Sequence, residues 1–318
     1  MPPARKIWFL AFGVCLLALL WDDLSLRLCQ LERINKNHES MPQRLQQLEN
    51  LGVQIKVLES QVADLNKNQG IFNETLSQTN ARLEQLRFWK ESFFKGMLTE
   101  KGIQVLSVPA LEDITISSYQ THLEAAWGEK KYLTVGLVTV DYRYRSLIEF
   151  AKPENLKNKK IVGAVLYLKQ IKTDSWAEGK NAVTETIDLY AVKKKWHEGH
   201  GIRGVAEKGQ ATWISARTGE ELWSKAGCSA PGQDFENVVL ASSGPVINGF
   251  GQDWAMIIFN EEGLKRLQQW MAEDPSLENG FLLKARDEKR DFKAMFFHSH
   301  NSYDQKSVPY LEIYYLSR

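Results

Sequence analysis

Two short histidine motifs carry the side chains of this chain that are best suited to metal chemistry. The segment WHEGHG offers His197 and His200, and the segment FHSH offers His298 and His300 on one face of an extended strand. Imidazoles are frequent zinc ligands. The first motif falls in a predicted loop and the second in an ordinary strand, without the acid and base spacing of a known hydrolase. The motifs alone therefore do not predict a zinc centre.

Asp113, near the start of the C-terminal region, is a candidate ligand for a structural calcium ion, which binds carboxylate and carbonyl oxygens. No other cofactor is expected, because the chain lacks a Gly-rich phosphate loop, a Gly-x-Ser-x-Gly elbow and a Cys-x-x-Cys pair. The acid pairs Glu220-Glu221 and Glu261-Glu262 adjoin a turn and a helix start, which explains them structurally. We therefore expect a protein that is not an enzyme.

Arginines and tyrosines on outward strand faces are the candidate contacts for an acidic carbohydrate. If the apolar residues of SLIEF point inward, Arg143 and Arg145 point outward, and the same alternation places Tyr167 and Tyr190 outside. Guanidinium groups pair with carboxylates, and rings stack on sugars. Trp223, which follows a Gly turn, is the fifth candidate. A solvated sheet face is the competing interpretation.

Four other tryptophans are expected to fill the core rather than to hold a ligand. A large aromatic ring buries roughly 150–250 Å², and a sugar platform needs rings that stay exposed. These four residues are Trp196, Trp213, Trp254 and Trp270.

The elements that position these side chains are predicted to be mainly strands. Residues 101–318 contain runs such as YLTVGLVTV, IVGAVLYLKQI and WAMIIF, which are β-branched, aromatic and separated by Gly, Asn, Asp and Lys. One helix is expected after Asn260, with Leu264, Leu267 and either Trp270 or Met271 on its buried face. The region therefore predicts an all-β sandwich with one inserted helix.

The order of these motifs resembles the DNRLRE family of jelly-roll domains, which is similar to carbohydrate-binding modules on bacterial and archaeal surface proteins. The resemblance covers about residues 107–318 and implies a jelly-roll β-sandwich that binds carbohydrate. The chain differs from the family at Ala125-Ala126 and in a basic insert at about residues 193–208. The motifs that carry the resemblance are Asp113, Trp127-Gly128, SLIEF, IVGAVLYL, Ile187 to Val192 with Trp196 and Glu198, Ala211-Thr212-Trp213, Trp223, Gly227, Trp254, Trp270, Asn279-Gly280, Phe297 with Ser299, and Pro309 to Tyr315.

Residues 1–23 indicate a membrane anchor. Arg5 and Lys6 precede an unbroken apolar run from Ile7 to Trp21, and acidic residues end it. The positive-inside rule keeps the N-terminus cytoplasmic and places the C-terminal domain in the periplasm or outside the cell. The run is shorter than the roughly 20 residues of a usual span, so a cleaved signal is the alternative.

Residues 24–100 are typical of a coiled-coil stalk. Apolar residues alternate at spacings of four and three from Leu51 to Leu86, with Gln69 and Thr79 as exceptions. The pattern predicts a parallel dimer, with a trimer as the alternative, and a lone amphipathic helix is the competing interpretation. In a parallel oligomer, copies of Cys29 could form a disulfide bridge.

The composition argues against nucleic acid as a partner, since 40 basic residues balance 39 acidic ones. Together these features predict a single-pass, membrane-anchored surface protein that displays a carbohydrate-binding head and binds to itself through its stalk. The partner of the head is then a polysaccharide or an envelope protein. A structural envelope protein is the second hypothesis, and a polysaccharide-degrading enzyme with two carboxylates in a cleft is the third.

Overall fold

The computed structural model describes residues 52–53, 55–57, 59–60, 83, 102–138, 142–171, 184–247, 254–272, 275–289 and 294–316. The predicted anchor (1–23), most of the predicted stalk (24–100) and Cys29 lie outside these residues. Within them, no helix combines the length and the apolar character needed to cross a membrane. The chain divides into two compact units, Met1–Leu83 and Glu84–Arg318.

Little of the N-terminal unit is described, but what is described is helical. Residues 52–53, 55–57, 59–60 and 83 have helical backbone. Ile55 and Leu83, two positions of the predicted heptad seam, are buried within a single chain. The coiled coil itself remains a prediction.

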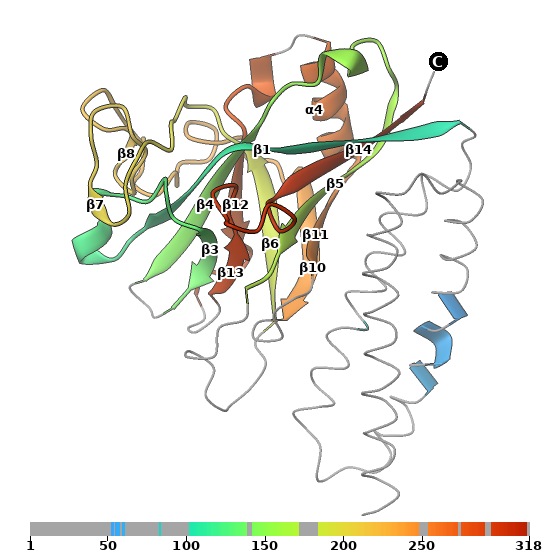
Figure 1. Ribbon diagram of the computed structural model, residues 1–318, viewed down its shortest axis with the longest axis horizontal. Helices are drawn as coiled ribbons and strands as arrows, with labels where there is room; N and C mark the ends of the chain where they lie inside the picture. Colours follow the sequence, from blue (N-terminus) through green and yellow to red (C-terminus); the bar gives the residue numbers. More distant parts are fainter. Residues whose placement is uncertain are drawn as a thin grey trace, which may run out of the picture. The chain divides into compact units, whose positions relative to one another are not determined.

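The C-terminal unit is built mainly from strands, which confirms the all-β prediction (Figure 1). The principal strands are β1 (Ile103–Ser117), β3 (Tyr132–Leu137), β4 (Arg143–Phe150), β5 (Ile161–Lys169), β6 (Thr184–Ala191), β10 (Ala241–Ile247), β11 (Trp254–Phe259), β12 (Phe281–Ala285), β13 (Met295–His298) and β14 (Tyr310–Leu316). The short elements are η1 (Gln120–His122), β2 (Ala125–Ala126), η2 (Glu154–Leu156), β7 (Gly204–Val205), β8 (Ser215–Arg217), β9 (Glu221–Leu222) and η3 (Pro275–Leu277).

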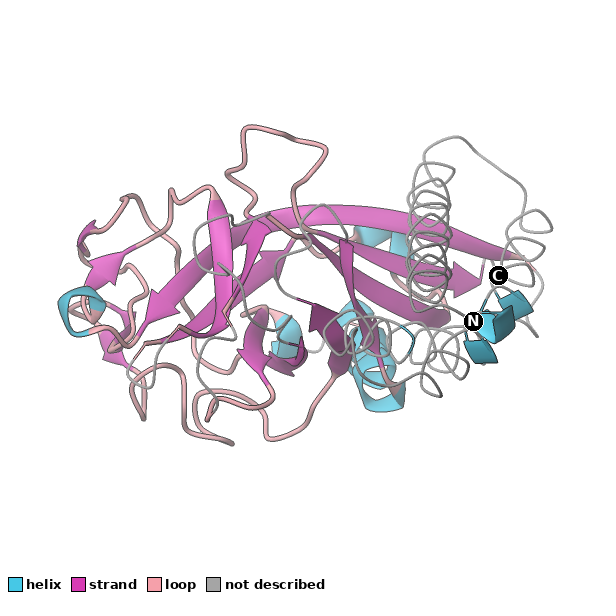
Figure 2. Ribbon diagram, turned by 90° about the horizontal axis from the view of Figure 1, so that it is seen from below, coloured by secondary structure: helices cyan, strands magenta, loops and turns pink. Residues whose placement is uncertain are grey.

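Among the described strands, antiparallel pairing closes a ring in the order β1-β14-β5-β11-β10-β6-β12-β4 and back to β1. The ring closes because the long strand β1 pairs with β14 through Ile103–Pro109 and with β4 through Ala110–Ser117. The sequence predicted the two layers of a sandwich, whereas β1 connects the strands into one barrel-like sheet (Figure 2). Strand β3 extends from β4, and β13 pairs with β3.

The side chains that point into the ring form the main hydrophobic core. Alternate residues of β4, β6 and β12 supply it, as the twofold period of a strand requires. Ile148 and Phe150 point inward as predicted. Phe281 and Phe297 are among its largest fully buried side chains. Helix α4 (Glu261–Met271) adds Leu267, Trp270 and Met271 to this core.

The local signals for α4 are confirmed. The Asn260 side chain accepts a hydrogen bond from the backbone N–H of Gly263, and acidic residues occupy the first turn. Gln268 accepts a hydrogen bond from the N–H of Ile161 and donates one to the carbonyl of Lys159, which fixes the helix beside the start of β5 (Figure 1).

A second hydrophobic core lies on the outer side of β1, β4, β6 and β12. Residues 192–235 form a cap over this side, and Trp196, Trp213 and Trp223 pack there with Ile114 and Leu147. The Asp234 carboxylate organises the cap by accepting hydrogen bonds from the backbone N–H groups of Ser224, Lys225 and Ala230. These bonds outweigh the effect of burial and lower the pKa of Asp234.

Candidate functional site

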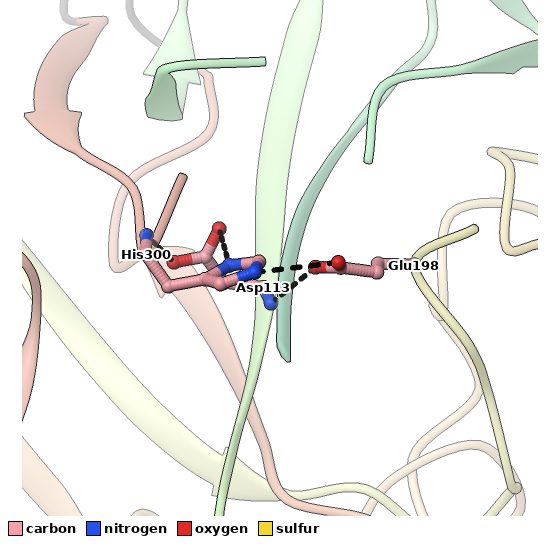
Figure 3. Close-up of side chains that lie close together, drawn as sticks. All are labelled: Asp113, Glu198 and His300. Carbon is pink, nitrogen blue, oxygen red and sulfur yellow. Dashed lines mark hydrogen bonds and ion pairs between the residues drawn. The ribbon is translucent and has the colours of Figure 1, made fainter. Parts of the chain in front are cut away.

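Asp113, Glu198 and His300 come together from three separate segments (Figure 3). Asp113 lies on β1, just after a register shift between Ala110 and Glu112, and only 1% of it is exposed. Glu198 lies in the cap, and His300 follows β13. One ligand atom from each residue lies within 4.8 Å of the others. We call these three residues the Asp113 cluster.

Backbone amides hold both carboxylates in place. Glu198 Oε2 accepts a hydrogen bond from the N–H of Asp113 at 3.0 Å, and Asp113 Oδ2 accepts one from the N–H of His300 at 2.7 Å. The other oxygens face the imidazole, with Asp113 Oδ1 3.2 Å from Nδ1 and Glu198 Oε1 3.3 Å from Nε2. Each carboxylate therefore uses one oxygen for the backbone and presents the other to His300.

The contact between Asp113 Oδ1 and His300 Nδ1 is an ion-pair contact rather than an aligned hydrogen bond. Both atoms are buried and have no hydrogen-bond partner of acceptable geometry, although they lie 3.2 Å apart. Burial alone would lower the pKa of His300, but the two carboxylates outweigh it and raise that pKa to about 10. Burial raises the pKa of Asp113, against the influence of His300.

Neighbouring side chains support the segments that carry the Asp113 cluster. Glu112 Oε2 accepts a hydrogen bond from the N–H of Glu198 at 3.1 Å and lies 2.7 Å from His197 Nδ1. Ser299 donates its hydroxyl proton to the carbonyl of Lys130 at 2.7 Å, which fixes the turn before His300. The loops of residues 127–131 and 298–301 are thereby joined.

The four histidines of the two motifs do not gather at one point. Only His300 joins the Asp113 cluster, whereas His298 contacts the hydroxyl of Ser302 and His200 is exposed, 3.6 Å from Glu129. The calcium expectation also fits this cluster poorly, because calcium prefers a shell of six to eight oxygens and an imidazole nitrogen is not such a ligand. Asp113 was identified from the sequence, but its partners were not, because Glu198 and His300 lie in distant loops.

A second cluster combines cations with aromatic rings. His122, Trp127 and Lys130 are buried, with exposed fractions of 6%, 7% and 8%. Lys130 Nζ lies 4.4 Å from the ring centre of Trp127 and 3.9 Å from that of Tyr132. Arg203 Nε donates a hydrogen bond to Nε2 of His122 at 3.0 Å. We call these five residues the Lys130 cluster.

Three groups at the Lys130 cluster are hydrogen-bond donors. Because Nε2 of His122 accepts from Arg203, its proton lies on Nδ1, and Nδ1 is buried without a partner. The indole N–H of Trp127 is likewise buried without a partner. No carboxylate lies within ion-pair distance of Lys130 in the described part of the chain. Burial, followed by the charge of Arg203, lowers the pKa of Lys130 to about 7.

A small two-stranded flap positions Arg203. Strand β7 pairs with β2 through Ala125↔Val205, and the N–H of Arg203 donates to the carbonyl of Ala126. Arg203 has a positive φ of 70°, which is uncommon for a residue with a side chain. Strained backbone of this kind clusters at binding sites.

The carbohydrate contacts predicted from the sequence are placed differently from the expectation. Arg143 is exposed and Tyr190 is half-buried. Arg145, Tyr167 and Trp223 do not point into the barrel, but all three are buried. The exposure predicted for Arg145 and Tyr167 is therefore wrong, and Trp223 is packed rather than open to a sugar.

Neighbouring side chains explain this burial. The cap covers Arg145, whose guanidinium pairs with both carboxylate oxygens of Glu288, at 2.8 and 2.6 Å. Tyr167 stacks on Tyr310, with the ring centres 4.8 Å apart. Trp223 Nε1 donates a hydrogen bond to the carbonyl of Thr212.

The tryptophans expected in the core are placed as follows. Trp196, Trp213 and Trp270 are buried. Trp254 is half-buried and meets Tyr167 and Tyr310 edge-on. Trp213 and Trp223, ten residues apart, thus pack in the cap rather than form an open platform.

Comparison with known proteins adds no assignment. No protein-family model matches the chain, and no curated protein sequence matches it either.

Proposed function

We propose that the C-terminal unit is a non-catalytic binding head for an acidic carbohydrate and that the Lys130 cluster is its binding site. The observation that carries this proposal is Lys130 itself, a buried lysine between two aromatic rings with no carboxylate partner among the described residues. A buried charge without a partner is costly, so its presence calls for a functional reason.

The chemistry of the cluster suits a sugar that bears a carboxylate. The exposed Arg203 and Tyr132 are the first contacts for the ligand. Lys130 and the N–H groups of Trp127 and His122 are buried behind them and become contacts once the flap moves aside; unlike Arg145 and Trp223, the two N–H groups have no partner within the protein. A carboxylate with neighbouring hydroxyls supplies acceptors for all of these groups. Tyr132, which is partly exposed, adds an aromatic face. The acidic ligand inferred from the sequence is therefore retained, while its site moves from the outward strand faces to this cluster.

The proposal for the whole protein follows from the N-terminal sequence. The head is carried by a coiled-coil stalk of residues 24–100 on a membrane anchor of residues 1–23, outside the cytoplasm. The resemblance to jelly-roll DNRLRE domains supports a surface role, and a closed ring of antiparallel strands is compatible with such a fold.

A protein-interaction role is the second candidate function, because the flap exposes apolar side chains. Ile202 and Val205 flank Arg203 and are 65% and 86% exposed. Exposed apolar groups beside a fixed cation are typical of a protein contact.

The decisive experiment is a titration of the purified full-length protein with oligosaccharides of uronic acids and with neutral oligosaccharides of equal length. We expect calorimetric binding of the acidic series only. The variant R203A should weaken binding at least about tenfold, since one charge-assisted contact contributes about 1.5–3 kcal/mol. K265A, which changes an exposed lysine of α4, is the matched control and should bind as the wild type does.

Two outcomes would overturn the assignment. Loss of binding in R143A with normal binding in R203A would return the site to the strand face predicted from the sequence. Binding of no acidic oligosaccharide, together with loss of a protein partner in a Val205→Asp variant, would favour the protein-interaction role.

A further inference from the structure

The Asp113 cluster lies outside the proposed carbohydrate site, and its geometry suggests different chemistry. Two carboxylates and one imidazole, from three segments, converge on a small volume that is largely closed to solvent. Nitrogen and carboxylate donors are the ligand set that zinc and similar divalent transition metals prefer.

Only one nitrogen of the imidazole can bind a given ion, and the carboxylate oxygen that faces either nitrogen lies at the separation expected of two ligands of one metal. Asp113 Oδ1 lies 3.2 Å from Nδ1, and Glu198 Oε1 lies 3.3 Å from Nε2. Two ligands that each lie about 2.0–2.1 Å from a tetrahedral zinc ion are about 3.3 Å apart. The three ligand atoms lie within 4.8 Å of one another. Because the two carboxylates face different nitrogens of the ring, the imidazole or one carboxylate has to turn for all three residues to bind one ion.

The environment of the donors is the second, independent observation. Only 1% of Asp113 is exposed, and its Oδ1 faces the imidazole without an aligned hydrogen bond. His300 Nδ1 is also buried and lacks an aligned hydrogen bond. An imidazolium held by two carboxylates would explain the proximity of the groups, but its N–H would be expected to align with the buried oxygen.

The surroundings also anchor the two carboxylates. The second oxygen of each carboxylate is fixed by a backbone N–H, and Glu112 fixes the backbone of Glu198. Outer contacts of this kind orient metal ligands and raise affinity.

We propose that Asp113, Glu198 and His300 bind one divalent transition-metal ion of the zinc type. The ion joins β1, the cap and the loop after β13. Calcium and magnesium are not expected to replace it, because they select oxygen ligands.

The test is a titration of the metal-free, full-length protein with zinc chloride, followed by calorimetry and thermal unfolding. We expect one ion per chain and a rise in the unfolding temperature that excess calcium or magnesium does not reproduce. Cobalt(II) should give the visible absorption of a site with nitrogen and oxygen ligands. E198Q keeps the size of the side chain and should weaken zinc binding at least about 100-fold, as should H300Q.

The exposed histidine at position 200 provides the matched control. H200Q removes an imidazole from the same loop without touching the Asp113 cluster, and it should leave zinc binding unchanged. If H300Q fails to fold, E198Q and the cobalt spectrum of the wild type still decide the question.

The proposal is overturned if no ion binds at millimolar zinc, if E198Q binds zinc as well as the wild type does, or if H200Q abolishes binding. It is also overturned if calcium stabilises the protein more than zinc does. Carbohydrate binding is measured separately in metal-free protein, so failure of the metal site leaves the proposed function intact.

Discussion

Arg143 and Arg145 lie two residues apart on β4, yet the structure gives them different roles. Arg143 is exposed, whereas the Arg145 guanidinium is enclosed by Glu288, the carbonyls of Gly227 and Cys228, and the ring of Trp213 at 5.4 Å. A buried guanidinium with these partners holds the cap to the barrel and is not available to a ligand.

The variant R145A should destabilise the fold by about 3–5 kcal/mol, because it leaves the buried carboxylate of Glu288 without its partner. R143A, on the same strand face, should change the free energy of unfolding by less than about 0.5 kcal/mol. Urea denaturation of both variants measures the difference. Wild-type stability of R145A combined with a loss of carbohydrate binding would show that Arg145 contacts the ligand after all.

The buried charge of Lys130 lowers the stability of the fold, while the proposed function needs that charge to bind the ligand. Its pKa in the folded protein is about 7, below the value of 10.5 that it has when exposed. Below pH 7 the lysine is charged in both states, so the folded protein carries the full cost of the buried charge. Between pH 7 and 10.5 the unfolded chain binds more protons, and stability therefore rises with pH.

Replacing Lys130 with Met should consequently stabilise the protein by about 1–3 kcal/mol at pH 6, and this advantage should vanish near pH 10.5. The same variant should lose acidic oligosaccharides. Urea denaturation at pH 6 and pH 10.5 tests the first part, and calorimetry tests the second. A destabilised K130M at pH 6 would contradict the assignment of an unpaired buried charge.

At the level of elements, the sequence predicted the strands well, but it did not predict the cap that covers their outer face. Alternation along SLIEF gave the correct inward face of β4, because a period of two follows from strand geometry. The same alternation could not show that residues 192–235 fold back over the outer face. Arg145 was therefore placed on the correct side of the sheet but wrongly expected to be exposed, and Tyr167, also on the correct side, is covered by Trp254 and Tyr310.

The candidate sites were harder to predict than the strands, because the Asp113 cluster joins three distant segments and the Lys130 cluster needs the flap that brings Arg203 to His122. Asp113 and His300 lie 187 residues apart in the sequence, and the backbone N–H of His300 donates a hydrogen bond to the Asp113 carboxylate. Lys130 sits in a turn beside Gly128, where no sequence motif marks a buried cation. Only the type of each residue, an acid or an imidazole, was visible beforehand.

The turn at Gly128 packs closely against the cap, and this contact can be tested by substitution. A Cβ at Gly128 would overlap the carbonyl oxygens of Glu198 and Gly199, whereas a Cβ at Gly204 on β7 would meet nothing within 4 Å. G128A should therefore destabilise the protein by about 1–3 kcal/mol and weaken carbohydrate binding by displacing the cap from the turn.

The matched variant G204A should stay within about 0.5 kcal/mol of the wild type, since it adds a methyl group to open space. Thermal unfolding and calorimetry of G128A and G204A show whether the loss comes from the close contact of Gly128 with the cap or from any glycine-to-alanine change in this region. Equal effects of the two substitutions would show that the contact between Gly128 and the cap does not control the site.

For the whole molecule, the main question is whether the heptad pattern joins separate chains. The seam predicts a dimer or trimer, yet Ile55 and Leu83 are already buried within one chain. Burial without a second copy is also what a helix packed within its own chain would produce. Oligomerisation matters for function, because two or three weak carbohydrate sites on one stalk bind a polymer far more tightly than one site does.

Sedimentation equilibrium of the full-length protein should therefore give a dimer or a trimer. A double variant, L58D and L65D, places charges in the predicted seam and should yield monomers, whereas K56A changes an exposed position and should not. On a surface coated with acidic polysaccharide, the monomeric variant should bind at least about 100-fold more weakly, while its affinity for a short oligosaccharide stays the same. A monomeric wild type would instead assign the seam to packing within the chain, and multivalent binding would then need a different origin.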